Sequence, residues 1–175
     1  MRHQASIAVA ALGQAEKPHF SFFAEMRTGA ANGSLLRMSL EAARKHLERA
    51  SQQLDRAATD AWEPADPASC VTNVFYAYEN LIAAVAEAKN LTWTKSHYKK
   101  AELAKELAGQ GILSKDFSDH LLRLNDLRKD VSYGEPGMEL SDQDLEFFVA
   151  ELEDTIEEVK GIVCGSEEEA GEDNG

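Results

Sequence analysis

The sequence has few cysteines, few prolines and no long hydrophobic run. Its 175 residues include two cysteines, Cys70 and Cys164, which lack CxxC or Cys/His spacing, so neither a disulfide framework nor a familiar zinc site is expected. No apolar run approaches the roughly 18 to 20 residues of a membrane-spanning helix. The run from Ile7 to Leu12 is too short for a secretory signal. We therefore expect a cytoplasmic protein that does not enter a membrane.

The common catalytic motifs are also missing. The chain has no phosphate-binding glycine loop, no HExxH, no GxSxG and no EF-hand loop. Its five histidines are dispersed, and none is paired at helical spacing. Carboxylates do recur three and four residues apart near the C-terminus, but this pattern is more typical of a solvated helix face than of a di-metal site. The sequence thus predicts neither a metal nor a cofactor.

Basic residues are almost absent from the C-terminal part of the chain. The sequence has 31 acidic and 18 basic residues and a net charge of -13. Residues 1–138 contain 17 of each sign, whereas residues 139–175 contain 14 acids and one base, Lys160. Polyanions are bound mainly through Lys and Arg contacts to phosphate. Since the acidity belongs to one end, the neutral body retains the capacity to bind RNA.

Helical periodicity dominates from residue 35 onward. The first expected helix carries one apolar stripe, made of Leu36, Leu40, Ala43, Leu47, Ala50, Leu54, Ala57 and Ala61. The second follows Asp66, a capping residue, and Pro67, which suits a first helical position. It is the most apolar segment of the chain and is expected to be central. No segment alternates like a strand, so the chain is predicted to be all-α, an antiparallel up-and-down bundle of about five helices.

Three further helices complete the expected bundle. The third covers Ser96 to Gly109, the fourth follows Ser114 as its cap, and the fifth follows Ser141, which forms an approximate capping box with Asp144. The chain is accordingly divided into an irregular N-terminal arm over 1–33, the helical bundle over 34–164 and a disordered acidic tail over 165–175. The arm contains an apolar cluster of phenylalanines, Phe20, Phe22 and Phe23, which is expected to dock on the body or on a partner.

Several segments resemble motifs of one known family. LRKDVSYGE, residues 127–135, is similar to the LR-x-x-x-x-YG-(D/E) signature of the small bacterial and archaeal branch of the HEPN family, the higher eukaryotes and prokaryotes nucleotide-binding proteins. VTNVFYAY, residues 71–78, resembles that group's VNRAYYAAF, and the AKNL and KSH that follow resemble its AKGL and KSH. The resemblance covers residues 35–160 in helix order. The bundle is therefore interpreted as HEPN-like.

The resemblance implies a function. Many HEPN proteins are metal-independent ribonucleases that dimerise, so that two copies of an arginine and a following histidine meet in one cleft. Several are toxins or host-defence factors, and the small branch is commonly paired with a minimal nucleotidyltransferase. By resemblance we expect a homodimer of toxin-antitoxin or host-defence type that acts as an endoribonuclease. The alternative is a non-catalytic module that binds a nucleotide or a nucleotidyltransferase antitoxin.

Residues of the site are transferred from the same motifs. Arg128 matches the motif arginine, and Tyr133 stands where the nuclease members have histidine. Tyrosine ordinarily titrates near pH 10, so about one part in a thousand is phenolate at neutral pH and it is a poor unaided base. Arg128 and Tyr133 are the predicted catalytic residues. Lys129, Tyr76 and Asn80 are the predicted substrate-binding residues.

The same residues also have purely structural interpretations. Without the resemblance, Arg128 is better interpreted as pairing with Asp130 or another exposed carboxylate, or as capping the last carbonyls of its helix. Tyr76 is suited to buried packing, and Asn80 to a hydrogen bond between helices. His97 is expected at the surface, at the start of the third helix.

Overall fold

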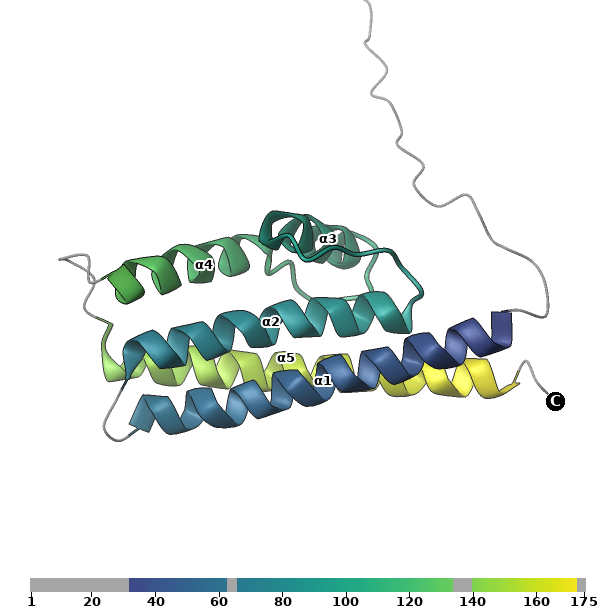
Figure 1. The fold of residues 1–175 in the computed structure, drawn as a ribbon, viewed down its shortest axis with the longest axis horizontal. Coiled ribbons are helices and arrows are strands. Elements are labelled where there is room, and N and C mark those ends of the chain that lie inside the picture. Colours follow the sequence, from purple (N-terminus) through teal and green to yellow (C-terminus); the bar gives the residue numbers. More distant parts are fainter. Residues whose placement is uncertain (1–31, 63–65, 134–139, 173–175) are drawn as a thin grey trace, which may run out of the picture.

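The computed structural model describes residues 32–62, 66–133 and 140–172. These residues form five α-helices and no strand, which confirms the predicted all-α bundle (Figure 1). The helices are α1 (Asn32–Trp62), α2 (Pro67–Ala88), α3 (His97–Gly109), α4 (Ser118–Tyr133) and α5 (Asp142–Glu172).

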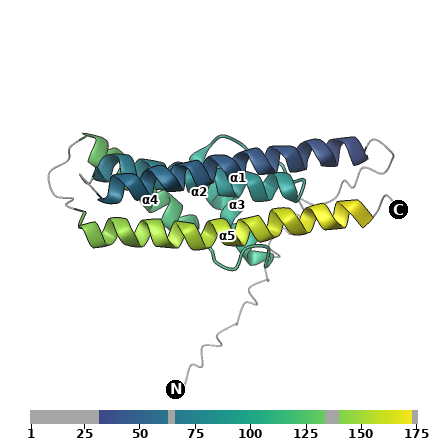
Figure 2. The same ribbon diagram turned by 90° about the horizontal axis from the view of Figure 1, so that it is seen from below.

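Helix α2 lies at the centre of the bundle, as its apolar composition predicts. It contacts each of the other four helices. Figure 1 shows α2 between α4 and α1, with α3 beside α4, and Figure 2 shows the long helices α1 and α5 running side by side in opposite directions. The short helix α3 packs on α2 and α4. Helix α2 therefore has α1 on one side and α3 and α4 on the other.

The apolar stripe of α1 faces the bundle. Leu40, Ala43, Ala50, Ala57 and Ala61 are buried, and Leu47 and Leu54 are partly buried against the same core. Small alanine side chains let two helix backbones approach closely, which explains the extensive α1–α2 contact.

The ends of α2 and α5 are capped as the sequence predicts. The Asp66 carboxylate accepts a hydrogen bond from the Ser69 backbone N–H at 3.0 Å, and Pro67 is the first helical residue. At α5, the Ser141 backbone N–H donates to Asp144 Oδ2 at 3.0 Å. The capping box is closed by the Asp144 N–H, which donates to Ser141 Oγ at 3.3 Å.

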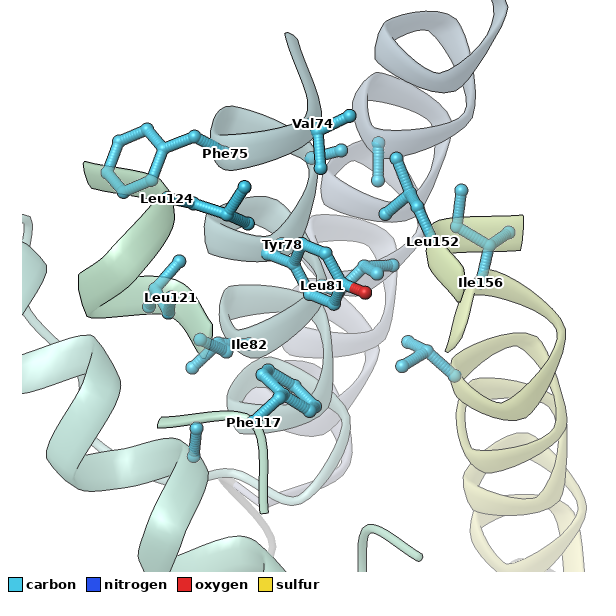
Figure 3. Close-up of a cluster of buried hydrophobic side chains, with 14 of the residues drawn as sticks. Val74, Phe75, Tyr78, Leu81, Ile82, Phe117, Leu121, Leu124, Leu152 and Ile156 are labelled. Atoms are coloured by element: carbon cyan, nitrogen blue, oxygen red, sulfur yellow. The ribbon is translucent and has the colours of Figure 1, made fainter. Parts of the chain in front are cut away.

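The core is built around the inward side chains of α2. Phe75, Tyr78 and Leu81 are essentially inaccessible to solvent and meet inward residues of α4 and α5, such as Leu124 and Leu152 (Figure 3). Burial of aromatic and aliphatic side chains of this size is the main stabilising term for a bundle. The site described below is attached to the α3/α4 side of this core.

The prediction of a disordered acidic tail is wrong for most of that segment. Residues 165–175 were expected to be disordered, but α5 continues to Glu172. Val163 and Ser166 keep the inward spacing and are 1% and 5% exposed, and Ser166 Oγ donates to the Ile162 carbonyl at 2.9 Å. The buried stripe of α5 therefore continues past Gly165 to Ser166. Residues 173–175 lie outside the described residues.

Two helix starts also differ from expectation. The N-terminal arm was placed at 1–33, but α1 begins at Asn32; the rest of the arm, with its phenylalanine cluster, lies outside the described residues. Helix α4 begins at Ser118, so Ser114 is not its cap. Instead Ser114 donates from its backbone N–H and its hydroxyl to the Glu158 carboxylate, at 2.5 and 3.0 Å. An N-cap serine accepts a backbone N–H through its hydroxyl oxygen, whereas this hydroxyl is a donor to a carboxylate of α5.

Candidate functional site

Arg128 is held by neutral groups on α2 and α4. Its Nη1 donates to the Tyr76 hydroxyl at 2.8 Å, and its Nη2 donates to Asn125 Oδ1 at 3.1 Å. The guanidinium carbon lies 4.8 Å from the centre of the Phe75 ring and 5.4 Å from that of Tyr76. Two aromatic faces and two hydrogen bonds therefore fix the plane of a half-buried cation.

No described carboxylate neutralises Arg128. The pair with Asp130 that the sequence allowed is not formed among the described residues, and the neighbouring Lys129 pairs with Asp126 at 3.0 Å. The Arg128 Nε atom is buried and has no described hydrogen-bond partner. A half-buried cation with neutral neighbours favours an anion, because a charged acceptor compensates its lost hydration better than a neutral one.

The predicted catalytic pair does not meet within this chain. Tyr133 is the last residue of α4 and is 82% exposed. It forms no hydrogen bond or ring contact with another described residue. Five residues along a helix correspond to a rotation of about 140°, and α4 stays helical through Tyr133, so this side chain points away from Arg128. The tyrosine that contacts Arg128 is Tyr76.

The predicted substrate-binding residues separate into different environments. Tyr76 belongs to the Arg128 cluster. Asn80 instead joins α2 to α1: its Nδ2 donates to Gln53 Oε1 at 3.0 Å and to the Tyr76 carbonyl at 2.9 Å, and its Oδ1 lies 2.8 Å from His46 Nδ1. Since both ends of the amide are occupied, Asn80 has the structural role of a hydrogen bond between helices.

A second polar cluster lies beside Arg128 and was missed by the sequence analysis. Glu79 of α2 is 5% exposed and lies against two basic residues of α3. Its Oε1 is 2.5 Å from His97 Nδ1, and its Oε2 is 3.3 Å from Lys100 Nζ. His97 was expected to be a surface residue, but its side chain is 38% exposed and anchored to a buried carboxylate. The available signal was a glutamate within the most apolar helix, because such a residue is rarely buried without a partner.

Phe75 connects the two clusters. Its ring centre is 5.2 Å from that of His97 and 4.8 Å from the Arg128 guanidinium carbon. The imidazole and the guanidinium both contact the Phe75 ring and therefore lie at most about 10 Å apart. We call the set Phe75, Tyr76, Glu79, His97, Lys100, Asn125 and Arg128 the Arg128–His97 cluster.

Comparison of the sequence with protein-family models and with curated proteins finds no match. The HEPN interpretation consequently rests on the motifs quoted above.

Other reactive groups are poorly placed for chemistry. Burial raises the pKa of the Cys70 thiol to about 11, which keeps it protonated near neutral pH and fits its expected role as a small core residue. Burial also lowers the pKa of His120, whose ring contacts those of Tyr78 and Phe148. Neither group touches the Arg128–His97 cluster.

Hollows and possible metal sites were also sought. A shallow hollow of about 560 Å³ between the end of α1 and the start of α2 includes Asp60, and one of about 330 Å³ beside α5 includes Tyr78. Neither includes Arg128. The described residues contain no group of three His, Cys, Asp or Glu side chains placed to hold a metal ion. None of the described helices is long and apolar enough to cross a lipid bilayer.

Proposed function

We propose that the chain is a HEPN-like RNA-binding protein of toxin-antitoxin or host-defence type, in which Arg128 contacts a backbone phosphate. The observation that carries this proposal is the guanidinium of Arg128, half-buried and held only by neutral described partners. An arginine presents a planar fork of N–H donors that matches the oxygens of a phosphodiester. The position of Arg128 also matches the motif arginine.

The proposed active form is a homodimer in which two Arg128–His97 clusters border one cleft. In a single chain the cluster lies on one side of α2, between α4 and α3, and neither of the two hollows described above contains it. A second copy would supply the opposite wall and exclude water from the phosphate contacts. Size-exclusion chromatography with light scattering tests the proposed homodimer. A molecular mass of one chain at micromolar protein concentration would contradict it.

RNA binding is tested with a matched pair of arginine variants. Arg128→Ala removes the proposed phosphate contact, whereas Arg123→Ala removes an exposed arginine from another face of the same helix. Fluorescence anisotropy with single-stranded RNA and EDTA is expected to show at least about tenfold weaker binding for Arg128→Ala, equal to about 1.4 kcal/mol. Arg123→Ala should bind like wild type. Equal losses in both variants, or no RNA binding at all, would refute the proposal.

The salt dependence separates a phosphate contact from a general loss of charge. Each phosphate contact adds close to one unit to the slope of log affinity against log salt concentration. Arg128→Ala is therefore expected to reduce that slope by about one. Arg128→Lys keeps the charge and loses the fork, so its affinity should fall between those of wild type and Arg128→Ala.

A second candidate function is suggested by the surface of α5. Its exposed carboxylates include Asp142, Asp144, Glu146, Glu153, Asp154 and Glu157. These acids, the acidic face of α5, do not belong to the Arg128–His97 cluster and are suited to steer a basic partner such as a nucleotidyltransferase. Charge reversal of Glu153 and Glu157 to lysine should weaken such binding in a salt-sensitive manner. Reversal of the exposed Glu41 on α1 is the control, and equal effects would contradict this candidate.

A further inference from the structure

His97 is oriented with one ring nitrogen against a buried carboxylate and the other unoccupied. Its Nδ1 lies 2.5 Å from Glu79 Oε1. An ionised carboxylate can only accept, so Nδ1 is the donor of this hydrogen bond, and in the neutral imidazole Nε2 is then the proton acceptor. No described residue bonds Nε2, and the side chain is 38% exposed. This is the arrangement that a histidine needs in order to take a proton from a bound molecule.

Lys100 supplies a counterion for Glu79 that is independent of His97. Its Nζ lies 3.3 Å from Glu79 Oε2, and it is 5.4 Å from the centre of the Trp93 ring. The side chain of Lys100 is 10% exposed, so this ion pair is a buried feature of the α2–α3 contact. Because Lys100 balances the carboxylate, the imidazole is not required as its cation. Glu79 Oε1 is thus available to orient the imidazole through Nδ1.

The Phe75 ring brings His97 close to the proposed phosphate contact. Both basic groups lie about 5 Å from this buried side chain, the imidazole at 5.2 Å and the Arg128 guanidinium carbon at 4.8 Å. The two groups therefore lie at most about 10 Å apart, a distance that a ribose, its 3′-phosphate and one hydrogen bond at each end can span. The phosphate can therefore reach Arg128 while the 2′-hydroxyl of the same nucleotide reaches Nε2 of His97.

We propose that His97 is the general base of RNA cleavage at this site, with Glu79 as its positioning residue and Arg128 as the ligand of the reacting phosphate. This inference rests on the proposed RNA-binding function. It places the proton acceptor on α3, in a position that does not depend on Tyr133. The protein then retains a general base although Tyr133 stands at the position of the motif histidine.

The step is a transesterification without oxidation or reduction. His97 Nε2 accepts the 2′-hydroxyl proton, and the 2′-oxygen forms a bond to phosphorus. The bond between phosphorus and the 5′-oxygen breaks, and that oxygen takes a proton from water. The imidazolium returns its proton to solvent, so protons balance. The products are a 2′,3′-cyclic phosphate and a 5′-hydroxyl end, and no metal ion takes part.

The test compares cleavage and binding in the same samples of full-length protein. A labelled single-stranded RNA is incubated with enzyme and EDTA, and product ends are identified by mass spectrometry. His97→Ala should lower kcat by about 100- to 10,000-fold, the range of general base catalysis. Its RNA affinity should stay within about twofold of wild type, and added imidazole should restore part of the rate. His97→Gln keeps a hydrogen-bond donor for Glu79 but has no proton acceptor of the imidazole kind. Its kcat should fall by the same factor as that of His97→Ala.

Glu79 and two other positions separate catalysis from folding. Glu79→Gln should lower kcat while KM is unchanged, because it alters the imidazole and not the phosphate contact. His120→Gln, which changes a histidine outside the cluster, should cleave like wild type. Tyr133→Phe should also retain its rate. Cleavage that survives His97→Ala but is lost in Tyr133→Phe overturns the assignment.

The proposed function and this inference fail in different ways. If wild-type protein binds RNA in an Arg128-dependent manner but leaves it intact, the assignment of His97 is wrong and RNA binding stands. If wild-type protein neither binds nor cleaves RNA, both are wrong. Cyclic phosphate ends that depend on both His97 and Arg128 would support both.

Discussion

The hydrogen bond between Tyr76 and Arg128 allows a quantitative test of how the site is held. Tyr76→Phe removes only the hydroxyl, which accepts from Arg128 Nη1 at 2.8 Å. The ring, whose centre lies 5.4 Å from the guanidinium carbon, is retained. The substitution therefore isolates a single hydrogen bond from the aromatic contact that accompanies it.

The expected magnitude follows from the charge and exposure of the pair. A hydrogen bond to a charged group contributes about 1.5–3 kcal/mol, and this one is only partly buried, so the lower end applies. We expect Tyr76→Phe to lower the free energy of unfolding by about 1–2 kcal/mol. In a double-mutant cycle with Arg128→Ala, the coupling free energy should be about 1 kcal/mol, because the second substitution removes the same bond.

Urea unfolding followed by far-UV circular dichroism measures these quantities. The midpoint should fall while the dependence on urea is unchanged, since the bond does not alter the area exposed on unfolding. Tyr133→Phe is the control: its side chain is 82% exposed, and the change should stay below about 0.5 kcal/mol. A coupling free energy below about 0.3 kcal/mol between Tyr76 and Arg128 would refute the reasoning.

Two further predictions concern the titration of groups outside the site. The Ser141 hydroxyl, and then its backbone N–H, lower the pKa of the Asp144 carboxyl below its ordinary value of 3.8. The capping box therefore stabilises the fold above that pH and loses its effect as the pH falls through the folded-state pKa; in urea midpoints measured against pH, Asp144→Asn should weaken this acid dependence. For the cysteines, burial raises the pKa of Cys70 to about 11, whereas Cys164 is exposed. Iodoacetamide at about pH 8 should add one group to the folded protein, at Cys164, and a native adduct on Cys70 seen by mass spectrometry contradicts this.

Much of the fold is visible in the sequence because helix patterns are local. The stripe of α1 and the central position of α2 were predicted from residues three and four apart, and the Asp66 and Ser141 caps from neighbours within one turn. Ser114 shows where local reasoning fails. Its N–H and hydroxyl donate to Glu158, 44 residues away, and no local pattern marks that contact.

The site shows the same division between local and distant information. The motif indicates Arg128 and places Tyr133 after it, and helix geometry alone separates these two side chains. The partners of Arg128 and His97 depend on how α2, α3 and α4 pack. Tyr76 is 52 residues from Arg128, and Glu79 is 18 residues from His97.

The sequence by itself determined the all-α bundle, the order of its helices, the concentration of negative charge at the C-terminal end and the resemblance around Arg128. Only the tertiary structure decided that Tyr76 contacts Arg128, that Tyr133 does not, and that His97 lies against Glu79 beside the same phenylalanine. The physical reason is that backbone hydrogen bonds and apolar periodicity act over one or two turns, whereas a buried ion pair forms only where separate helices bring its members together.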